Sequence, residues 1–142
     1  MFDELSKYKD NNHFFLTADE NLRQVCNAPN DKSGLYLIYA LKDGVEKLIY
    51  IGISGKVKKD GSLFIRKGGM KDRMINGHQF GKIPRKISWK GQIEIENIEK
   101  LHIYWYVTHN DKFTDCPRIL ENKLLKMHFE IFGRLPKWNK EF

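Results

Sequence analysis

Two glycine–tyrosine tripeptides on either side of a glycine turn predict a β-hairpin. Gly34-Leu35-Tyr36 comes before Lys42-Asp43-Gly44, and Tyr50-Ile51-Gly52 comes after it. The flanking residues are mostly leucine, isoleucine and tyrosine, which favour strands, and the glycine favours a tight turn between them. A two-residue turn would place Tyr36 and Tyr50 on opposite faces of the hairpin, whereas a three-residue turn would place them opposite each other on one face. We expect the three-residue turn.

The glycines beside the two tyrosines have no side chain, and we expect them to leave open surface next to the phenols. A phosphate group could then approach the backbone closely. The same residues also fit a plainer interpretation, in which the two rings only pack against each other across the strands. Chemistry therefore has to be argued from the rest of the chain.

The length and composition indicate one folded domain. A chain of 142 residues has room for one core but not for a separate recognition domain, so specificity would come from loops or from a partner. No apolar run reaches the length of a membrane span, and the N-terminus lacks the basic and apolar segments of a secretory signal. We therefore expect a soluble, cytoplasmic protein that does not contact a membrane. Cys26 and Cys116 have no metal-site spacing, so we expect reduced thiols and no zinc site.

The positive charge is concentrated in one segment. Residues 56–90 contain 11 basic and 2 acidic residues, a net charge of +9, although the whole chain carries only +7. Phe64, Phe80 and Trp89 lie among them, and cations interleaved with aromatic rings are typical of surfaces that bind a nucleic-acid backbone. A lysine-rich face that is simply solvated is the alternative. The candidate DNA contacts are Lys56, Lys58, Arg66, Lys67, Lys71, Arg85 and Lys86.

The remaining patterns predict an α+β fold, with a small central antiparallel sheet of about three strands flanked by helices. We expect a helical lead-in over 1–33, in which Thr17-Ala18-Asp19-Glu20 has the sequence of a capping box. The hairpin follows over 34–53, and one or two further strands over 93–108. Helices are predicted over 70–76 and 115–132, and basic loops over 54–61 and 80–92.

The helix predicted over 115–132 carries a candidate metal ligand. Leu120, Leu124 and Met127 recur at helical spacing and form its apolar stripe. Glu121 lies on the flank of that stripe, at the border between core and solvent, where a carboxylate can point toward the sheet edge. One carboxylate, with water as the remaining ligands, is a common way to hold Mg²⁺.

Hydrolysis of a phosphodiester needs a base for the attacking water, positive charge on the phosphate and stabilisation of the leaving oxygen. Tyr36 and Tyr50 are candidate bases, provided that a metal ion, cations or a bridging water overcome the ordinary tyrosine pKa of about 10. Arg73 is a candidate for charge stabilisation, because its guanidinium stays charged and binds phosphate oxygens in pairs. Glu121 would hold the metal ion that serves the leaving oxygen.

Taken together, these residues resemble the GIY-YIG nuclease family. The family's two tripeptides are matched by Gly34-Leu35-Tyr36 and Tyr50-Ile51-Gly52. The family's arginine helix is similar to Lys71-Asp72-Arg73-Met74-Ile75, which is followed by His78. The context of its metal-binding glutamate is similar to Leu120-Glu121-Asn122, and its C-terminal tail is similar to Pro136-Lys137-Trp138-Asn139. The catalytic residues that this resemblance implies are Tyr36, Tyr50, Arg73, His78, Glu121 and Asn139, with Glu121 binding Mg²⁺ or Mn²⁺.

The resemblance also implies a domain organisation. It spans residues 34–139 and places a nuclease domain over 34–142, with a basic insertion at about 56–90. The lead-in over 1–33 lies outside the match, and we expect it to pack on the domain.

Two features depart from the family pattern. The stretch between Gly52 and Arg73 is longer than usual, which makes Arg66 a rival for the catalytic arginine. Some members have a lysine directly after the second tripeptide, where this chain has Ile53. A nearby lysine of the basic segment could take that role, or the role could be absent.

The individual assignments also have alternatives. Members of the family differ in which tyrosine is assigned as the base, so that choice stays open. Arg73 could be one more surface cation, and Glu121 could simply favour the positive end of its helix. His78 is expected to be merely exposed, and Asn139 to brace the tail, although the family would place Asn139 beside the site.

We therefore expect a Mg²⁺-dependent endonuclease that cuts double-stranded DNA by direct attack of water, without a covalent intermediate. Its role would lie in restriction, mobility, repair or defence. Cutting both strands with one active site per chain would favour a homodimer. The first alternative is a module of the same fold that binds nucleic acid without cutting it. An RNA-directed nuclease and an unrelated basic protein are the others.

Overall fold

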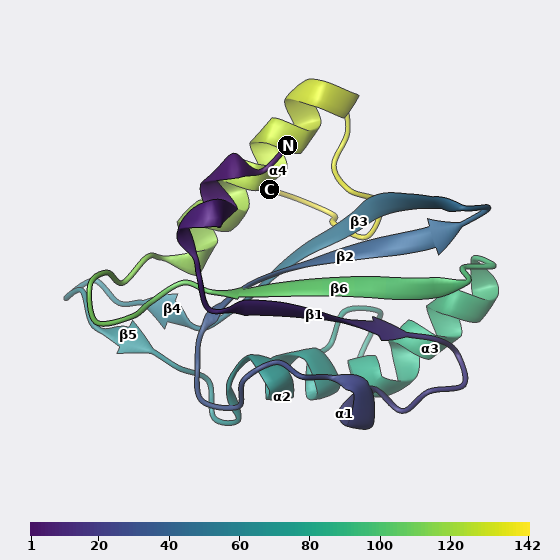
Figure 1. Ribbon diagram of the computed structural model, residues 1–142, viewed down its shortest axis with the longest axis horizontal. Coiled ribbons are helices and arrows are strands. Elements are labelled where there is room, and N and C mark those ends of the chain that lie inside the picture. Colours follow the sequence, from purple (N-terminus) through teal and green to yellow (C-terminus); the bar gives the residue numbers. More distant parts are fainter.

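A four-stranded antiparallel sheet forms the centre of the fold (Figure 1). The computed structural model describes residues 1–142, and the strands lie in the order β1-β6-β2-β3. They are β1 (Asn11–Leu16), β2 (Gly34–Lys42), β3 (Val45–Ser54) and β6 (Lys100–Val107). The predicted α+β class and central antiparallel sheet are confirmed, and the sheet has four strands where about three were expected.

The additional strand comes from the N-terminal lead-in, which was wrongly expected to be helical. β1 pairs with β6 as an outer strand, and Phe14 and Leu16 alternate with exposed residues, which is the period of a strand rather than a helix. Helix in this region is limited to the short 3-10 helix η1 (Asp3–Lys7) and one turn, α1 (Leu22–Val25). Thr17 N–H does donate to Glu20 Oε1 at 2.9 Å, but this bond closes a turn, and the helix begins later with Asn21 as its cap.

The hairpin between β2 and β3 closes with a two-residue turn, so the expected three-residue turn is wrong. Lys42 pairs with Val45, and the intervening Asp43 and Gly44 have φ angles of 53° and 76°, as a tight hairpin turn requires. The register then shifts between Ile38 and Tyr39, where a β-bulge adds one residue to β3.

The bulge restores the predicted arrangement of the tyrosines by a different route. Below it, Ile38 pairs with Tyr50 and Tyr36 pairs with Gly52. Residues two positions apart on a strand share a face, so Tyr36 and Tyr50 lie on the same face of the sheet. They are diagonal neighbours, however, and not directly opposite each other.

Helices cover both faces of the sheet (Figure 1). α1, α2 (Gly69–Asn76) and α3 (Arg85–Ile95) pack on the face that carries the two tyrosines, around the buried side chains of Met74 and Trp89. α4 (Pro117–Phe132) packs on the opposite face through Leu124 and Leu125, together with η1. None of these helices combines the length and the apolar character needed to cross a membrane.

Two regions that were predicted as basic loops are partly regular. Within 54–61, β4 (Lys56–Val57) begins a small hairpin with β5 (Leu63–Phe64). Most of 80–92 belongs to α3, which Pro84 precedes as the N-cap and which accommodates Gly91. The buried residues Arg85, Trp89 and Ile93 recur every four positions, and this helical spacing outweighs the turn signals of proline and glycine.

The other predicted elements are confirmed. α2 ends at Gly77, and α4 ends at Gly133, whose φ of 70° is the left-handed conformation typical of a helix stop. Of the region predicted to hold one or two strands, Lys100–Val107 forms β6, along which Leu101, Ile103, Trp105 and Val107 are buried.

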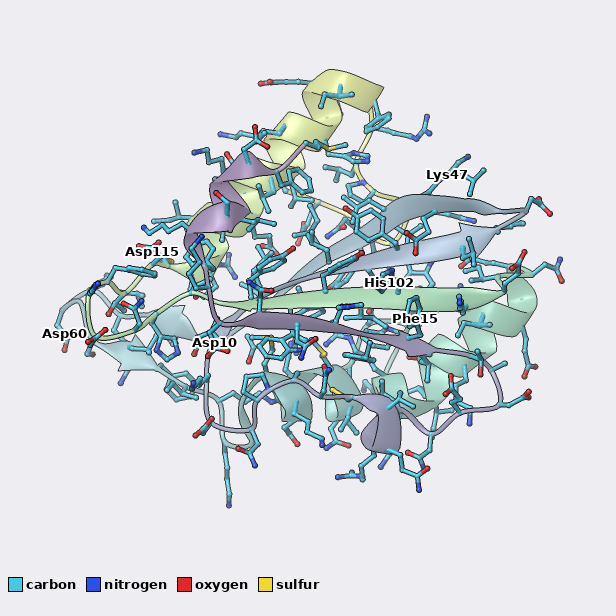
Figure 2. All side chains as sticks on the ribbon, viewed as in Figure 1. Asp10, Phe15, Lys47, Asp60, His102 and Asp115 are labelled. Carbon is cyan, nitrogen blue, oxygen red and sulfur yellow. The ribbon has the colours of Figure 1, made fainter.

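Side chains on the α4 side of the sheet anchor the N-terminus and form an aromatic cluster (Figure 2). Lys7 Nζ and Tyr8 Oη both donate to Asp115 at 2.7 Å, which ties η1 to the start of α4. Phe15 stacks on His102 with ring centroids 4.1 Å apart, next to the part of this face that carries no helix.

Replacing Gly52 by alanine should destabilise the protein. The added Cβ would lie 2.5 Å from Cε2 and 2.6 Å from Oη of the Tyr36 ring, and overpacking of this kind costs about 1–3 kcal/mol. Gly91→Ala is the matched control, because its Cβ would meet no atom within 4 Å and alanine favours a helix interior by about 0.5–1 kcal/mol. Urea unfolding of both variants measures the difference, and equal stability would contradict the packing of Tyr36 over Gly52.

Candidate active site

The two tyrosines form the floor of the candidate site. Their ring centroids lie 6.1 Å apart and their planes are tilted by 46°. Tyr36 is fully buried, and its Oη has no hydrogen-bond partner. Tyr50 is partly exposed. Of the two tyrosines, only Tyr50 is therefore open in part to water or a substrate.

Neighbouring atoms fill the space beside the glycines next to the tyrosines. The expectation of open surface there is therefore wrong. The ring of Tyr36 lies over Gly52, in the space that a Cβ would occupy. A Cβ on Gly34 would overlap the main-chain carbonyl of Tyr106 and lie 2.7 Å from Met70 Cε. Glycine is needed at both positions to let the strands and the phenol pack closely.

Arg73 lies on α2 near Tyr50 and Glu121. Its positive charge lowers the pKa of both residues, although burial outweighs this effect in each. The Arg73 guanidinium forms no hydrogen bond or ion pair, whereas Arg66 Nε donates to Asp72 Oδ2 at 2.8 Å. A free guanidinium is available to a phosphate, so the geometry favours Arg73 over Arg66.

Glu121 is half-buried on α4, and its carboxylate also has no hydrogen-bond or ion-pair partner. Burial raises its pKa, and the charges of Arg118 and Arg73 oppose this rise. A partly exposed carboxylate without a partner in the protein has its oxygens free to bind a cation. Glu121 therefore fits a Mg²⁺ or Mn²⁺ ion that keeps most of its water. No group of three or more histidine, cysteine, aspartate or glutamate side chains forms a richer metal site.

Tyr50 stays protonated at neutral pH in this environment. Burial and the neighbouring Tyr36 raise the pKa of Tyr50 to about 12. The charges of Arg85 and Arg73 act in the other direction, and Glu121 adds to the rise. The phenol is thus a hydrogen-bonding group before any ligand arrives.

Arg85 also lies beside Tyr36 and Tyr50, although the sequence did not predict it at the candidate site. It was expected among the DNA contacts, but its side chain is completely buried. Its Nη2 donates to Tyr50 Oη at 3.2 Å, and its Cζ lies 5.7 Å from the ring centroids of both Tyr36 and Tyr50. The helical spacing of Arg85 with Trp89 is the sequence signal that could have shown it to face the core.

Two further predicted residues do not face the other side chains of the site. Asn139 Nδ2 donates to the carbonyl of Ile51 at 3.0 Å, and Ile51 N–H donates to Asn139 Oδ1 at 2.9 Å. Both amide atoms thus brace the tail against β3, next to Tyr50, as the plainer interpretation proposed. His78 is exposed, and its ring forms no hydrogen bond or aromatic contact with the site.

The other basic candidates lie outside the core. Lys56, Lys58, Lys67 and Lys86 are exposed, and Arg66 and Lys71 are partly exposed. On the β4–β5 hairpin, Lys56 Nζ and Lys58 Nζ lie 5.6 and 5.8 Å from the centroid of the exposed Phe64 ring. This hairpin joins cations and an aromatic surface, which a nucleic acid can use together.

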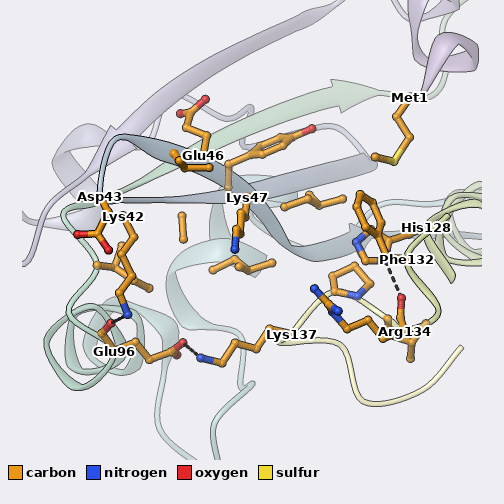
Figure 3. A pocket seen from close by; sticks show the side chains of 18 residues that line it. Met1, Lys42, Asp43, Glu46, Lys47, Glu96, His128, Phe132, Arg134 and Lys137 are labelled. Carbon is orange, nitrogen blue, oxygen red and sulfur yellow. Dashed lines mark hydrogen bonds and ion pairs between the residues drawn. The ribbon is translucent and has the colours of Figure 1, made fainter.

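A separate cavity of about 1000 Å³ lies between the β2–β3 hairpin, the C-terminal part of α4 and the tail (Figure 3). Lys137 Nζ pairs there with Glu96 Oε1 at 2.6 Å, and Lys42 Nζ donates to the Glu96 carbonyl at 2.9 Å. None of the candidate catalytic residues lines this cavity. It is therefore not part of the candidate active site.

Comparison of the chain with protein-family models, with curated proteins and with solved structures found no match in any of the three. The family resemblance therefore rests on the sequence motifs.

Removing the charge of Arg73 should raise the pKa of Glu121 further, because this charge opposes the effect of burial. The carboxyl titration of Glu121, followed by NMR, should move to higher pH in Arg73→Gln, and also in Arg118→Gln. Lys126→Gln, an exposed change on the same helix, is the control and should leave the titration in place. An unshifted Glu121 in Arg73→Gln would show that the two side chains do not approach each other in solution.

Proposed function

We propose that this protein is a metal-dependent endonuclease of the GIY-YIG type that hydrolyses phosphodiester bonds in double-stranded DNA. One observation carries the proposal. A guanidinium on α2 and a carboxylate on α4, both without partners in the protein, lie close enough to Tyr50 to shift its pKa. Charged side chains that the protein leaves unpaired at partly exposed positions are available to bind a charged ligand.

Each residue then has a role in the reaction. Arg73 binds the phosphate oxygens and stabilises the charge that develops on them. Tyr50 orients the attacking water through its hydroxyl, because at neutral pH it is a phenol, and it becomes a base only when further positive charge reaches its oxygen. A Mg²⁺ or Mn²⁺ ion held by Glu121 would supply positive charge at the leaving oxygen. Asn139 keeps β3 in place beside Tyr50.

The basic surface supports a nucleic acid as the substrate. Apart from the buried Arg85, the basic residues of 56–90 lie on α2, α3, the β4–β5 hairpin and the loops that connect them, and α2 also carries Arg73. Exposed cations next to an active-site guanidinium would hold the backbone near the reacting phosphate.

A second candidate is a module that binds nucleic acid without cutting it. The pKa of Tyr50, raised to about 12, favours this candidate, since almost none of the phenol is ionised at neutral pH and a protonated phenol does not act as a base. The two candidates share the basic surface and differ in whether Glu121 and Arg73 are needed for a covalent change in the DNA.

Supercoiled plasmid incubated with Mg²⁺ or Mn²⁺ tests the catalytic proposal. The wild-type protein should nick or linearise the plasmid, and Glu121→Ala and Arg73→Ala should each reduce the rate at least about 100-fold, the usual cost of removing a charge-stabilising group. Glu130→Ala on the exposed side of α4 is the control and should cut normally.

Four results would change this proposal. Binding without any cleavage in either metal would favour the non-cutting module. Equal cutting by Glu121→Ala would reject the metal ligand, and equal cutting by Arg73→Ala would move the catalytic role to Arg66. Cleavage of RNA in preference to DNA in the same assay would change the substrate.

The salt dependence of DNA binding tests the basic surface. Lys56→Ala should weaken binding and reduce the slope of log affinity against log salt by about 1, because one phosphate contact is lost. Phe64→Ala should weaken binding with an unchanged slope, since the ring carries no charge. Lys126→Ala removes one charge from α4 and is the control. Equal slopes for Lys56→Ala and Lys126→Ala would remove the β4–β5 hairpin from the DNA interface.

A further inference from the structure

Arg85 is a fully buried cation that has no carboxylate partner. Its side chain is entirely removed from solvent, and no ion pair involves it. Three hydrogen bonds hold it in place. Nε donates to Gln79 Oε1 at 3.1 Å, Nη1 to the carbonyl of Arg73 at 2.8 Å, and Nη2 to Tyr50 Oη at 3.2 Å. A buried charge is costly, so the surroundings of Arg85 must offset that cost or the charge must serve the site.

The surroundings offset part of the cost. The Arg85 Cζ lies 5.5 to 5.7 Å from the ring centroids of Trp89, Tyr36 and Tyr50, and aromatic faces attract cations. The carbonyl of Arg73 belongs to the last turn of α2, where the helix dipole also favours positive charge. Gly77 leaves the necessary space, because a Cβ at this position would lie 2.6 Å from Arg85 Nη1.

These bonds join two parts of the candidate site. Through the carbonyl of Arg73, Arg85 holds the helix that carries the phosphate-binding guanidinium. Through Tyr50 Oη, it holds the phenol on β3. The guanidinium is rigid and its N–H donors point in fixed directions, so these bonds fix the distance between α2 and Tyr50. A lysine at the same position could not make all three bonds in the same geometry.

The bond to Tyr50 also has a direction. A guanidinium donates and never accepts, so Tyr50 Oη accepts from Arg85. The proton of the phenol must then point away from Arg85, together with the remaining lone pair. Tyr36 Oη, which has no partner of its own, lies next to this pair of groups. The hydroxyl of Tyr50, a partly exposed residue, is thereby oriented before any ligand binds.

We infer that Arg85 is a positioning residue for catalysis, which holds Tyr50 against α2 and directs its hydroxyl toward the attacking water. This inference rests on the proposed nuclease function. It also assigns the active hydroxyl to Tyr50, and leaves Tyr36 as the buried ring that supports it.

Cleavage kinetics in Arg85→Lys and Arg85→Ala test the role. Both variants should lower kcat by about 10- to 100-fold, the cost of a misplacement of about 1 Å, while KM for DNA stays within about twofold. Guanidinium ions added to Arg85→Ala should restore part of the rate by filling the vacated site. Arg23→Lys, an exposed arginine on α1, is the control and should cut as the wild type does. A rise in KM at constant kcat would overturn the inference, because it would make Arg85 a contributor to DNA binding.

Tyr50→Phe supplies a test that survives if the Arg85 variants fail to fold, because it leaves the bonds of Arg85 to Gln79 and Arg73 intact. The NMR signals of the Arg85 guanidinium should show hindered rotation in the wild type. That hindrance should weaken in Tyr50→Phe and persist in Tyr36→Phe. Unchanged signals in Tyr50→Phe would overturn the inference whether or not the protein cuts DNA.

A double-mutant cycle completes the test. If Arg85 acts through Tyr50, adding Arg85→Lys to Tyr50→Phe should lower kcat no further, whereas additive losses would overturn the inference. A wild-type protein that shows the hindered guanidinium but cuts no DNA would instead overturn the proposed function, and the positioning role with it. The NMR and kinetic results thus separate the two failures.

Discussion

The β-bulge between β2 and β3 is the constraint on which the arrangement of the site depends. A two-residue turn without the bulge would pair Tyr36 with Ile51 and leave the two phenols on opposite faces of the sheet. One extra residue in β3 changes the partner of Tyr36 to Gly52, and glycine is also the residue that leaves room for the ring. Turn, bulge and glycine are therefore coupled, because each is useful only with the other two.

Burial and pairing divide the polar groups of this region into two kinds. Arg85 and Asn139 are bonded to main-chain atoms, and they hold α2 and the tail against the sheet. Arg73 and Glu121 have no such bonds, and they are placed by helices whose other residues supply the packing. Rigid elements thus present charged groups that remain unsatisfied within the protein, which is the arrangement expected of a site that binds a charged ligand.

The sequence predicted the parts of the fold that depend on local patterns. The α2 and α4 helices and the strand β6 follow from short-range periodicity. β1 was missed, because Asn11–Leu16 becomes a strand by pairing with β6, some 90 residues away, and local residues do not encode that partner. In the candidate site, Tyr36, Tyr50, Arg73 and Glu121 were identified by motif, whereas the buried position of Arg85 required the long-range packing of α3.

The electrostatics of Tyr50 suggest how binding and catalysis would be linked. Burial raises the pKa of Tyr50, and the two neighbouring guanidinium groups oppose that rise without overcoming it. The negative charge of Glu121 also raises the pKa of Tyr50. A cation that neutralised this carboxylate would therefore remove one of the effects that raise this pKa. An ion held by Glu121 would thus act on the phenol as well as on the leaving oxygen. Without such an ion the hydroxyl of Tyr50 stays protonated at neutral pH, so under the proposed function it would act as a base only after a cation has lowered its pKa.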